Sequence, residues 1–141
     1  MSLIIVAICA LESGCRYDPT IWRAEVRSPD GLWVAIASTL QTGGFGTAAI
    51  MTGVYLKRTN GSQPPVLVLS FWCNGPAARA YVLDNTANGG GTIHLTMLWT
   101  SPSQLDVTYD GNASLEFQVV KYAGIEITVQ NVKGVTTKAP Q

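Results

Sequence analysis

The sequence predicts an all-β domain: an antiparallel β-sandwich, or a small barrel or meander, of about seven or eight short strands after an N-terminal apolar segment. Three observations favour this class. After Cys15 the hydrophobic pattern has a period of two, turns rich in Gly, Pro and Asn recur at short intervals, and no window combines helical spacing with capping residues. At 141 residues the chain has the length of a single domain.

The clearest alternation lies in residues 21–27, where apolar and charged side chains follow one another in turn. One face of this strand is therefore expected to be buried and the other exposed. Ser28-Pro29-Asp30-Gly31 comes next, with a proline suited to the second turn position and a glycine that accepts a positive φ. Residues 32–39 return as a second strand, so the pattern predicts a hairpin.

The same pattern predicts the remaining strands at residues 47–58, 66–72, 92–99, 105–109, 115–122 and 125–132. Residues 66–72 are nearly all apolar, which is typical of a central strand that is covered on both faces. Residues 74–91 form the longest irregular region, with a short strand expected at 81–83. The single β domain is expected to span residues 15–132, followed by a flexible tail at 133–141.

The composition limits the classes of partner. Hydrophobic residues make up 47% of the chain and charged residues only 13%, below the roughly 25% that is usual for soluble domains. The formal net charge is zero, and the nine Lys and Arg residues are scattered along the sequence. A nucleic-acid-binding protein is expected to carry a clustered basic footprint, so no nucleic-acid partner is predicted.

The N-terminus predicts export. Residues 3–11 are uninterruptedly apolar, too short to span a bilayer but as long as the core of a secretory signal. Ser13 and Gly14 precede Cys15, and this arrangement resembles a bacterial lipoprotein signal, although Glu12 stands where leucine is usual and no Lys or Arg precedes the apolar run. The resemblance implies a removed segment 1–14, a lipid on Cys15 and a location on the periplasmic side of a bacterial membrane.

Two alternatives remain open for this segment. The signal is cleaved without lipidation and the protein is exported, or residues 3–11 form a first buried strand and Cys15 is a core cysteine. If Cys15 is not acylated, a disulfide between Cys15 and Cys73 becomes available in an oxidising compartment. The three cysteines have no zinc-binding spacing.

No catalytic residue, metal site or cofactor is predicted. The only histidine, His94, falls on the solvent side of its predicted strand and lacks a nucleophile to activate. The glycines of residues 43–46 are expected to connect a hairpin, because no Lys-Ser/Thr pair and no helix follow them. Four carboxylates are candidates for acid–base or calcium chemistry, but the Asp110-Gly111 pair is typical of a turn. These carboxylates are Asp84, Asp106, Asp110 and Glu116.

A candidate binding surface lies around the long irregular region. Trp72, Arg79, Tyr81 and Asp84 are close in the sequence, and aromatic residues and arginine are enriched in recognition patches. The alternative is that Trp72 ends a core strand and Tyr81 covers a sheet edge.

The hairpin carries a further resemblance. Residues 28–35 match an SPDG-x-W/Y-x-A pattern, and Gly43-Gly44-Phe45-Gly46-Thr47 follows. With the lipoprotein-like start, the chain resembles a set of uncharacterised small bacterial lipoproteins from residue 11 to about residue 130. The resemblance implies an envelope location and an all-β fold, and it carries no catalytic residue.

The predicted function is that of a non-enzymatic binding module in the cell envelope, with a protein or glycan partner. Two other functions stay open: an inhibitor or immunity protein that blocks a lytic enzyme, and a hydrolase whose carboxylates converge only in three dimensions.

Overall fold

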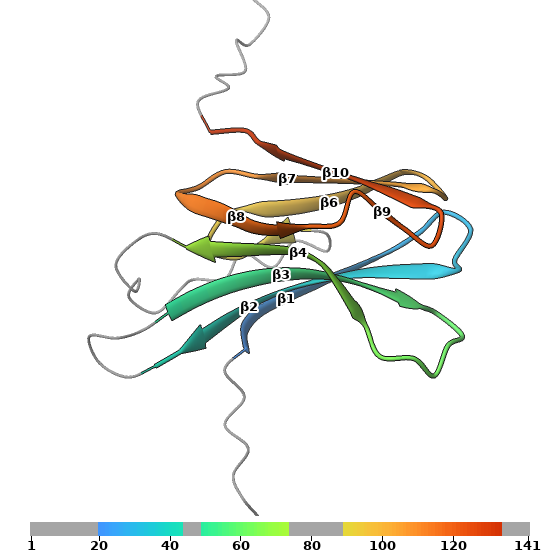
Figure 1. The fold of residues 1–141 in the computed structure, drawn as a ribbon, viewed down its shortest axis with the longest axis horizontal. Helices are drawn as coiled ribbons and strands as arrows, with labels where there is room; N and C mark the ends of the chain where they lie inside the picture. Colours follow the sequence, from blue (N-terminus) through green and yellow to red (C-terminus); the bar gives the residue numbers. More distant parts are fainter. Residues whose placement is uncertain (1–19, 44–48, 74–88, 134–141) are drawn as a thin grey trace, which may run out of the picture.

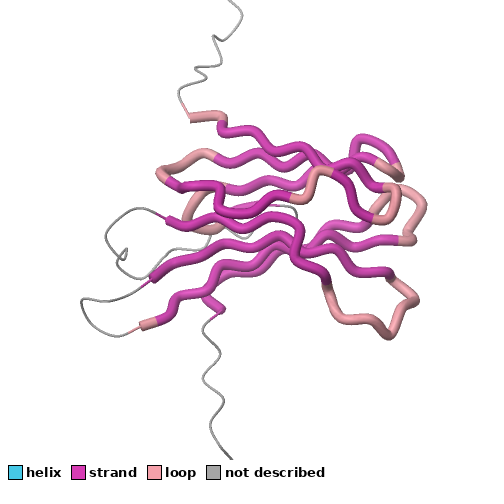
Figure 2. Tube along the Cα trace, in the orientation of Figure 1, coloured by secondary structure: helices cyan, strands magenta, loops and turns pink. Residues whose placement is uncertain are grey.

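The computed structural model describes residues 20–43, 49–73 and 89–133. In these ranges the chain forms ten β-strands and no helix. The strands make two five-stranded sheets that face each other as the two layers of a sandwich (Figure 1, Figure 2). The all-β sandwich prediction is confirmed, and eight of the ten strands have six or more residues. Within those ranges, nothing qualifies as a membrane-crossing helix.

The first sheet has the strand order β1-β2-β3-β4-β8, and every neighbouring pair is antiparallel. Its strands are β1 (Thr20–Arg27), β2 (Trp33–Thr42), β3 (Ala49–Arg58), β4 (Val66–Cys73) and β8 (Ala113–Gln118). The antiparallel neighbours β2 and β3 pair as far as Thr42 and Ala49, and the predicted connection at 43–46 lies outside the described residues except for Gly43.

The second sheet has the order β5-β6-β7-β10-β9. Its strands are β5 (Gly89–Gly90), β6 (Leu95–Ser101), β7 (Gln104–Tyr109), β9 (Lys121–Tyr122) and β10 (Ile125–Asn131). β10 runs parallel to β7, which corrects the prediction of a purely antiparallel fold. The reason is that the chain leaves the second sheet after β7 and passes through β8 of the first sheet before it returns. A crossover of this kind can bring a strand back in the same direction.

The predicted β1–β2 hairpin is confirmed, and its turn is held by side chains. Gly31 has a φ of 71°, and its N–H donates to the Ser28 carbonyl at 2.9 Å. The Ser28 hydroxyl donates to Asp30 Oδ1 and accepts from the N–H of Trp33, at 2.5 and 3.0 Å. The Thr59 hydroxyl donates to the Gly31 carbonyl at 2.7 Å and so ties the turn to the end of β3. The turn residues therefore fix where β1 ends and β2 begins.

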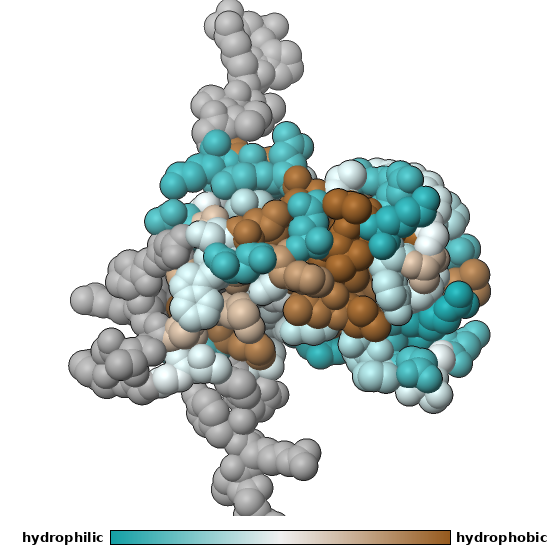
Figure 3. Space-filling view, in the orientation of Figure 1, coloured by the Kyte–Doolittle hydropathy of each residue, from teal (hydrophilic) through white to brown (hydrophobic). Residues whose placement is uncertain are grey.

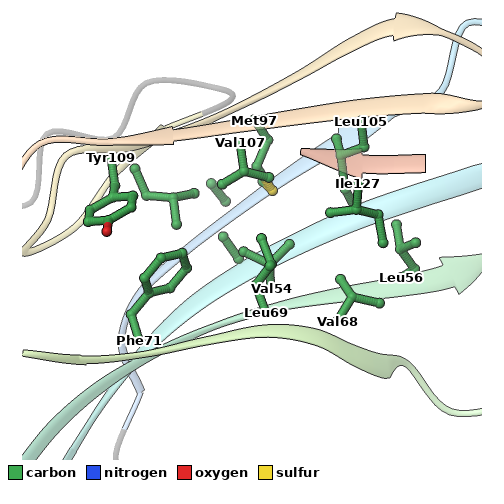
Figure 4. Packing of buried hydrophobic residues seen from close by; sticks show 14 of the residues in the cluster. Val54, Leu56, Val68, Leu69, Phe71, Met97, Leu105, Val107, Tyr109 and Ile127 are labelled. Atoms are coloured by element: carbon green, nitrogen blue, oxygen red, sulfur yellow. The ribbon is translucent and has the colours of Figure 1, made fainter. Parts of the chain in front are cut away.

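The core lies between the two sheets, and both sheets contribute side chains to it (Figure 4). Val54, Leu56, Val68, Leu69 and Phe71 come from the first sheet and are buried. They face buried residues of the second sheet, among them Met97, Leu105, Val107, Tyr109 and Ile127. The predicted inward faces of residues 21–27 and 125–132 both contribute to this core.

The strand at residues 66–73 differs from its prediction. β4 is central in its sheet, but Leu67 and Trp72 are exposed, because the outer face of the first sheet is not covered by another layer of described residues. A register shift on β4 places one extra residue, Val68, opposite β3, so that Val68 and Leu69 are both buried. The run of apolar residues therefore reflects a bulge and a solvent-facing apolar surface.

Two other predicted strands are wrong in their extent. Residues 91–94 form a turn in which His94 has a φ of 45°, and β6 begins only at Leu95. The predicted strand 115–122 is divided between the sheets, since the N–H of Val119 donates to Val68 in the first sheet and Val120 accepts from Ile127 in the second. The period of two carries no information on which sheet a strand joins, so the switch could not be seen in the sequence.

Candidate binding surface

Most of the predicted binding surface lies outside the described residues. This holds for Arg79, Tyr81 and Asp84, for the predicted lipid attachment at Cys15, and for the segments 1–14 and 81–83 and nearly all of the tail. Trp72 is described. It stands near the end of β4, a strand that contributes Val68, Leu69 and Phe71 to the core, but its own side chain lies on the solvent side of the first sheet with 42% of its surface exposed.

Trp72 belongs to a solvent-facing apolar surface that the sequence reasoning missed. The register of β3 and β4 pairs Met51 with Trp72 and Tyr55 with Leu67, and Ser70 on β4 pairs with Phe117 on β8. These positions alternate with core residues, so their side chains point away from the other sheet. Met51, Leu67 and Phe117 are 38%, 36% and 45% exposed. We name the side chains of Met51, Tyr55, Leu67, Trp72 and Phe117, together with Leu40 beside Met51, the outer apolar face.

A glycine on β3 is covered by an aromatic ring within the outer apolar face. Gly53 lies between Met51 and Tyr55 on β3, and a Cβ atom there would come within 2.9 Å of the Tyr55 ring and hydroxyl. The ring of Tyr55 therefore lies across Gly53. The neighbours of Gly53 on β2 and β4 are the small residues Ser38 and Ser70. An aromatic ring over a strand glycine covers backbone that would otherwise be exposed.

Hydrophobic side chains also gather at the edge of the sandwich where the chain passes from β8 of the first sheet to β9 of the second (Figure 3). Val120, at this crossing, is exposed. A small apolar cavity of about 170 Å³ lies nearby, lined by Trp33, Leu56 and Tyr122 among others. The Trp33 ring contacts Tyr122 edge-on at 6.1 Å and carries the Arg58 guanidinium 4.8 Å above it. These contacts join the first sheet to β9.

Basic residues that are scattered in the sequence meet in one groove. The groove, of about 220 Å³, is lined by Arg23 and Arg27 of β1 and by Lys57 and Arg58 of β3, together with Glu25, Val34, Ile36, Thr59 and Pro65. The alternation in residues 21–27 predicted that Arg23 and Arg27 share the solvent face. Only the register of β1, β2 and β3 brings Lys57 and Arg58 beside them, and no local signal could have indicated that.

Of the described candidates for catalysis, Asp110 lies beside the turn that holds His94, since its N–H donates to the Ile93 carbonyl at 2.8 Å. Asp106 and Glu116, by contrast, lie on different sheets. His94 is exposed in the turn before β6, as its predicted position on the solvent side requires. Asp106 on β7 accepts from Thr128 Oγ1 at 2.6 Å and from Gln104 Nε2 at 2.7 Å, and these hydrogen bonds, the first above all, hold the pKa of its carboxyl below the ordinary value. Glu116 lies on β8 of the other sheet.

The remaining candidates for chemistry are the Cys73 thiol and the side chains that could bind a metal ion. The Sγ atom of Cys73, at the end of β4, lies 3.3 Å from the Thr92 hydroxyl oxygen. Its predicted alternative partner Cys15 lies outside the described ranges. Among residues 20–43, 49–73 and 89–133, no three His, Cys, Asp or Glu side chains gather as a metal site would require.

A scan against protein-family models, a search of the curated proteins and a search of the solved structures each found no match.

Proposed function

We propose that the chain is a non-enzymatic binding module of the bacterial cell envelope, tethered through a lipid on Cys15, which holds a partner protein on its outer apolar face. The observation that carries the proposal is the exposure of Met51, Leu67, Trp72 and Phe117 on one side of one sheet. Contiguous apolar surface of this kind marks interaction sites in soluble domains.

The distribution of exposed hydrophobic residues supports a specific surface. Eight large hydrophobic side chains are exposed in the described ranges, and four of them lie on the outer side of the adjacent strands β3, β4 and β8. These four are Met51, Leu67, Trp72 and Phe117, whereas Leu115 on β8 pairs with the core residue Phe71. The second sheet contributes only Leu98 from a strand. Scattered single exposures would be spread over both sheets, so this concentration favours a docking surface on the first.

The chemistry of the outer apolar face favours a protein over a glycan. Aliphatic and thioether side chains such as Leu67 and Met51 offer no hydrogen bonds to sugar hydroxyls, whereas methionine and tryptophan are enriched at the centres of protein interfaces. The hydrogen-bonded sheet presents these groups on a backbone that is already ordered, so the ordering cost on binding is confined to the side chains. A partner with a complementary apolar patch fits this surface.

The envelope location is supported by the sequence. The apolar run of residues 3–11, Ser13-Gly14-Cys15 and the resemblance of residues 28–35 to small lipoproteins point to the same compartment. Mass spectrometry of the full-length chain produced in a bacterium tests it. We expect a diacylglycerol on Cys15, and Cys15→Ser is expected to move the protein out of the membrane fraction. Retention of Met1 in a soluble cytosolic protein would contradict the location.

The binding role is tested by crosslinking the full-length chain in cells and identifying its partner, with Trp72→Ser and Met51→Ser as test variants. Loss of a central aromatic anchor typically weakens an interface by at least about tenfold. We expect the crosslinked protein to be lost in both variants and kept in Leu98→Ser, a matched exposed residue on the second sheet. Equal loss in all three variants would contradict the surface.

The partner's identity also separates the two remaining functions. If the crosslinked protein is a lytic hydrolase and the purified chain lowers its activity, the module acts as an inhibitor or immunity protein. Turnover of esters, glycosides or peptides by the chain itself, lost on substitution of Asp106 or Glu116, would replace the binding role with the hydrolase.

A further inference from the structure

The charged residues of the described chain are balanced in number but separated in space. The described ranges contain six Lys and Arg residues and six Asp and Glu residues. The cationic residues are Arg23, Arg27, Lys57, Arg58, Lys121 and Lys133, and the anionic residues are Glu25, Asp30, Asp106, Asp110, Glu116 and Glu126. Four of the six cations line the single groove at the β1–β3 end of the first sheet, and Glu25 is the one carboxylate among its lining residues.

Strand pairing brings these residues together. Arg27 on β1 pairs with Val34 on β2, and Val34 pairs with Lys57 on β3, so the two cations flank Val34 on the solvent side of the sheet. Ile36 continues the same side. Val34 and Ile36 are only 8% and 5% exposed and form an apolar floor beneath the charged ends of their neighbours. The groove therefore combines an apolar base with cationic walls.

The groove keeps a positive excess after its internal ion pair is counted. Arg23 Nε and Nη2 both approach Glu25 Oε1, at 3.1 and 2.6 Å. Arg27 and Lys57 have no carboxylate partner among the described residues, where the only other ion pair joins Lys121 to Glu126. The Arg58 guanidinium stacks on the ring of the core residue Trp33 and also lines the apolar cavity, so the unpaired positive charge on the groove side comes from Arg27 and Lys57. Cations gathered in this way create a potential that attracts anions.

We propose that this groove binds a phosphate group carried by a small amphipathic ligand. Arginine forks and a lysine ammonium are the groups that recognise phosphate oxygens, and the floor of Val34 and Ile36 suits the uncharged part of the ligand. The ligand is either a free phosphate ester or the headgroup of an anionic lipid, which share this chemistry. A nucleic acid fits less well, because four cations in one short groove give no extended basic track.

The test uses the full-length chain, with Cys15→Ser in every sample so that no acyl chain is attached. Binding of inorganic phosphate, glycerol phosphate, and dihexanoyl phosphatidic acid below its micelle concentration is measured by titration followed by NMR. We expect saturable shifts of the Arg27, Val34 and Lys57 amides. Saturation by inorganic phosphate and glycerol phosphate identifies a free phosphate ester as the ligand. Saturation by the lipid alone identifies a lipid headgroup.

Matched variants separate a site from general attraction. Arg27→Gln with Lys57→Gln removes two positive charges from the groove, and Lys121→Gln with Lys133→Gln removes two from elsewhere. Because both lost cations face the anionic group, the groove variant should weaken binding about tenfold or more, while the control changes it less than twofold. Glu25→Gln, which removes the competing carboxylate, should tighten binding severalfold, an effect that misfolding cannot produce.

Three results would overturn the proposal: no saturable shifts with any of the phosphate compounds, equal weakening by the groove and control variants, or tighter binding of a short DNA duplex than of the phosphate compounds. The site does not depend on the outer apolar face or on the lipid anchor, so Trp72→Ser is expected to leave phosphate binding unchanged. Failure here and failure of the proposed function are therefore distinguishable.

Discussion

Two glycines share a left-handed backbone conformation but differ in the space available for a side chain. Gly31, in the β1–β2 turn, has a φ of 71°, and a Cβ atom there would have no neighbour within 4 Å. Gly91 has a φ of 73°, but a Cβ atom there would lie 2.7 Å from the buried Trp22 ring. The two sites thus have the same backbone requirement and differ in crowding. Because Trp22 belongs to the core, its ring cannot move aside without disturbing packing between the sheets.

Gly31→Ala is expected to lower the free energy of unfolding by about 1–2 kcal/mol, the cost of a left-handed conformation in an L-residue. Gly91→Ala is expected to cost about 1–3 kcal/mol more, because the added methyl group also overpacks the core. Urea denaturation of the two variants measures both values. Equal losses of unfolding free energy in the two variants would mean that the Trp22 ring moves aside without a cost to packing.

Asp30 makes the turn sensitive to acid. The pKa of its carboxyl lies below the ordinary value of 3.8. The main cause is the hydrogen bond from the Ser28 hydroxyl, and the second is the hydrogen bond from the Leu32 N–H. The folded state therefore favours the ionised form, so this stabilisation is present above the unfolded pKa and is lost as the pH falls through the folded one. We expect Asp30→Asn to be less stable than wild type at neutral pH and the difference to shrink below about pH 4. Thermal unfolding from pH 7 to pH 2.5 measures it, and a difference that grows on acidification would contradict the assignment.

At the scale of the elements, β10 is covered on one side only along much of its length. The N–H groups of Glu126 and Val132 donate to Ser103 and Tyr109 beside β7, and alternation gives Gln130 the same direction. Ile127 donates to Val120 on the opposite side, and β9 pairs only with the first two residues of β10. The N–H of Asn131 therefore points to the side without a neighbouring described strand.

Proline substitutions test this arrangement. Gln130→Pro removes a donor that pairs with β7 and leaves its acceptor unpaired, which is expected to cost about 1–3 kcal/mol. Asn131→Pro removes an outward donor and is expected to cost less, because proline is accepted on strand edges where the N–H faces solvent. Both side chains are exposed, but Asn131 Oδ1 accepts from the N–H of Lys133 at 2.9 Å. Each proline variant is therefore compared with alanine at the same position, which isolates the backbone. A lower denaturation midpoint for Asn131→Pro than for Gln130→Pro would mean that the Asn131 N–H, and not the Gln130 N–H, points toward β7.

The whole molecule is joined across both edges of the sandwich. On one edge the chain crosses between the sheets at Val119 and Val120; on the other, Trp99 Nε1 of the second sheet donates to the Val26 carbonyl of the first at 3.2 Å. Between them Phe71 and Tyr109, from opposite sheets, lie 4.8 Å apart in a tilted contact (Figure 4). Since each sheet buries its inner face only against the other, neither has a core of its own.

We therefore expect the two sheets to unfold together. Phe71→Ala removes a fully buried ring and is expected to cost about 3–5 kcal/mol, with a single transition retained. Tryptophan fluorescence reports on residues of both sheets, and far-UV circular dichroism reports on all the strands; the two curves should coincide. Separate transitions by the two probes would show that the sheets are independent units.

The sequence by itself determined which residues face inward along each strand and where the chain turns. The alternation at Trp22 and Ala24 and at Ile125 and Ile127, and the Ser28–Gly31 turn, follow from the local geometry of an extended chain, in which successive side chains point to opposite sides. Trp72 was singled out from its residue type and surroundings in the sequence; its side chain lies on the solvent side, and its role in binding stays a prediction. The rest of that predicted surface lies outside the described residues.

Only the tertiary structure decided which strands are neighbours. The parallel pairing of β7 with β10, the change of sheet at Val119–Val120, the outer apolar face and the meeting of Arg27 with Lys57 all depend on pairings between distant segments. Alternation is the same for a strand in either sheet, in any order and in either direction. The free energy of burying both inner faces together selects one of these arrangements, and that term is a property of the assembled sheets and of no single segment.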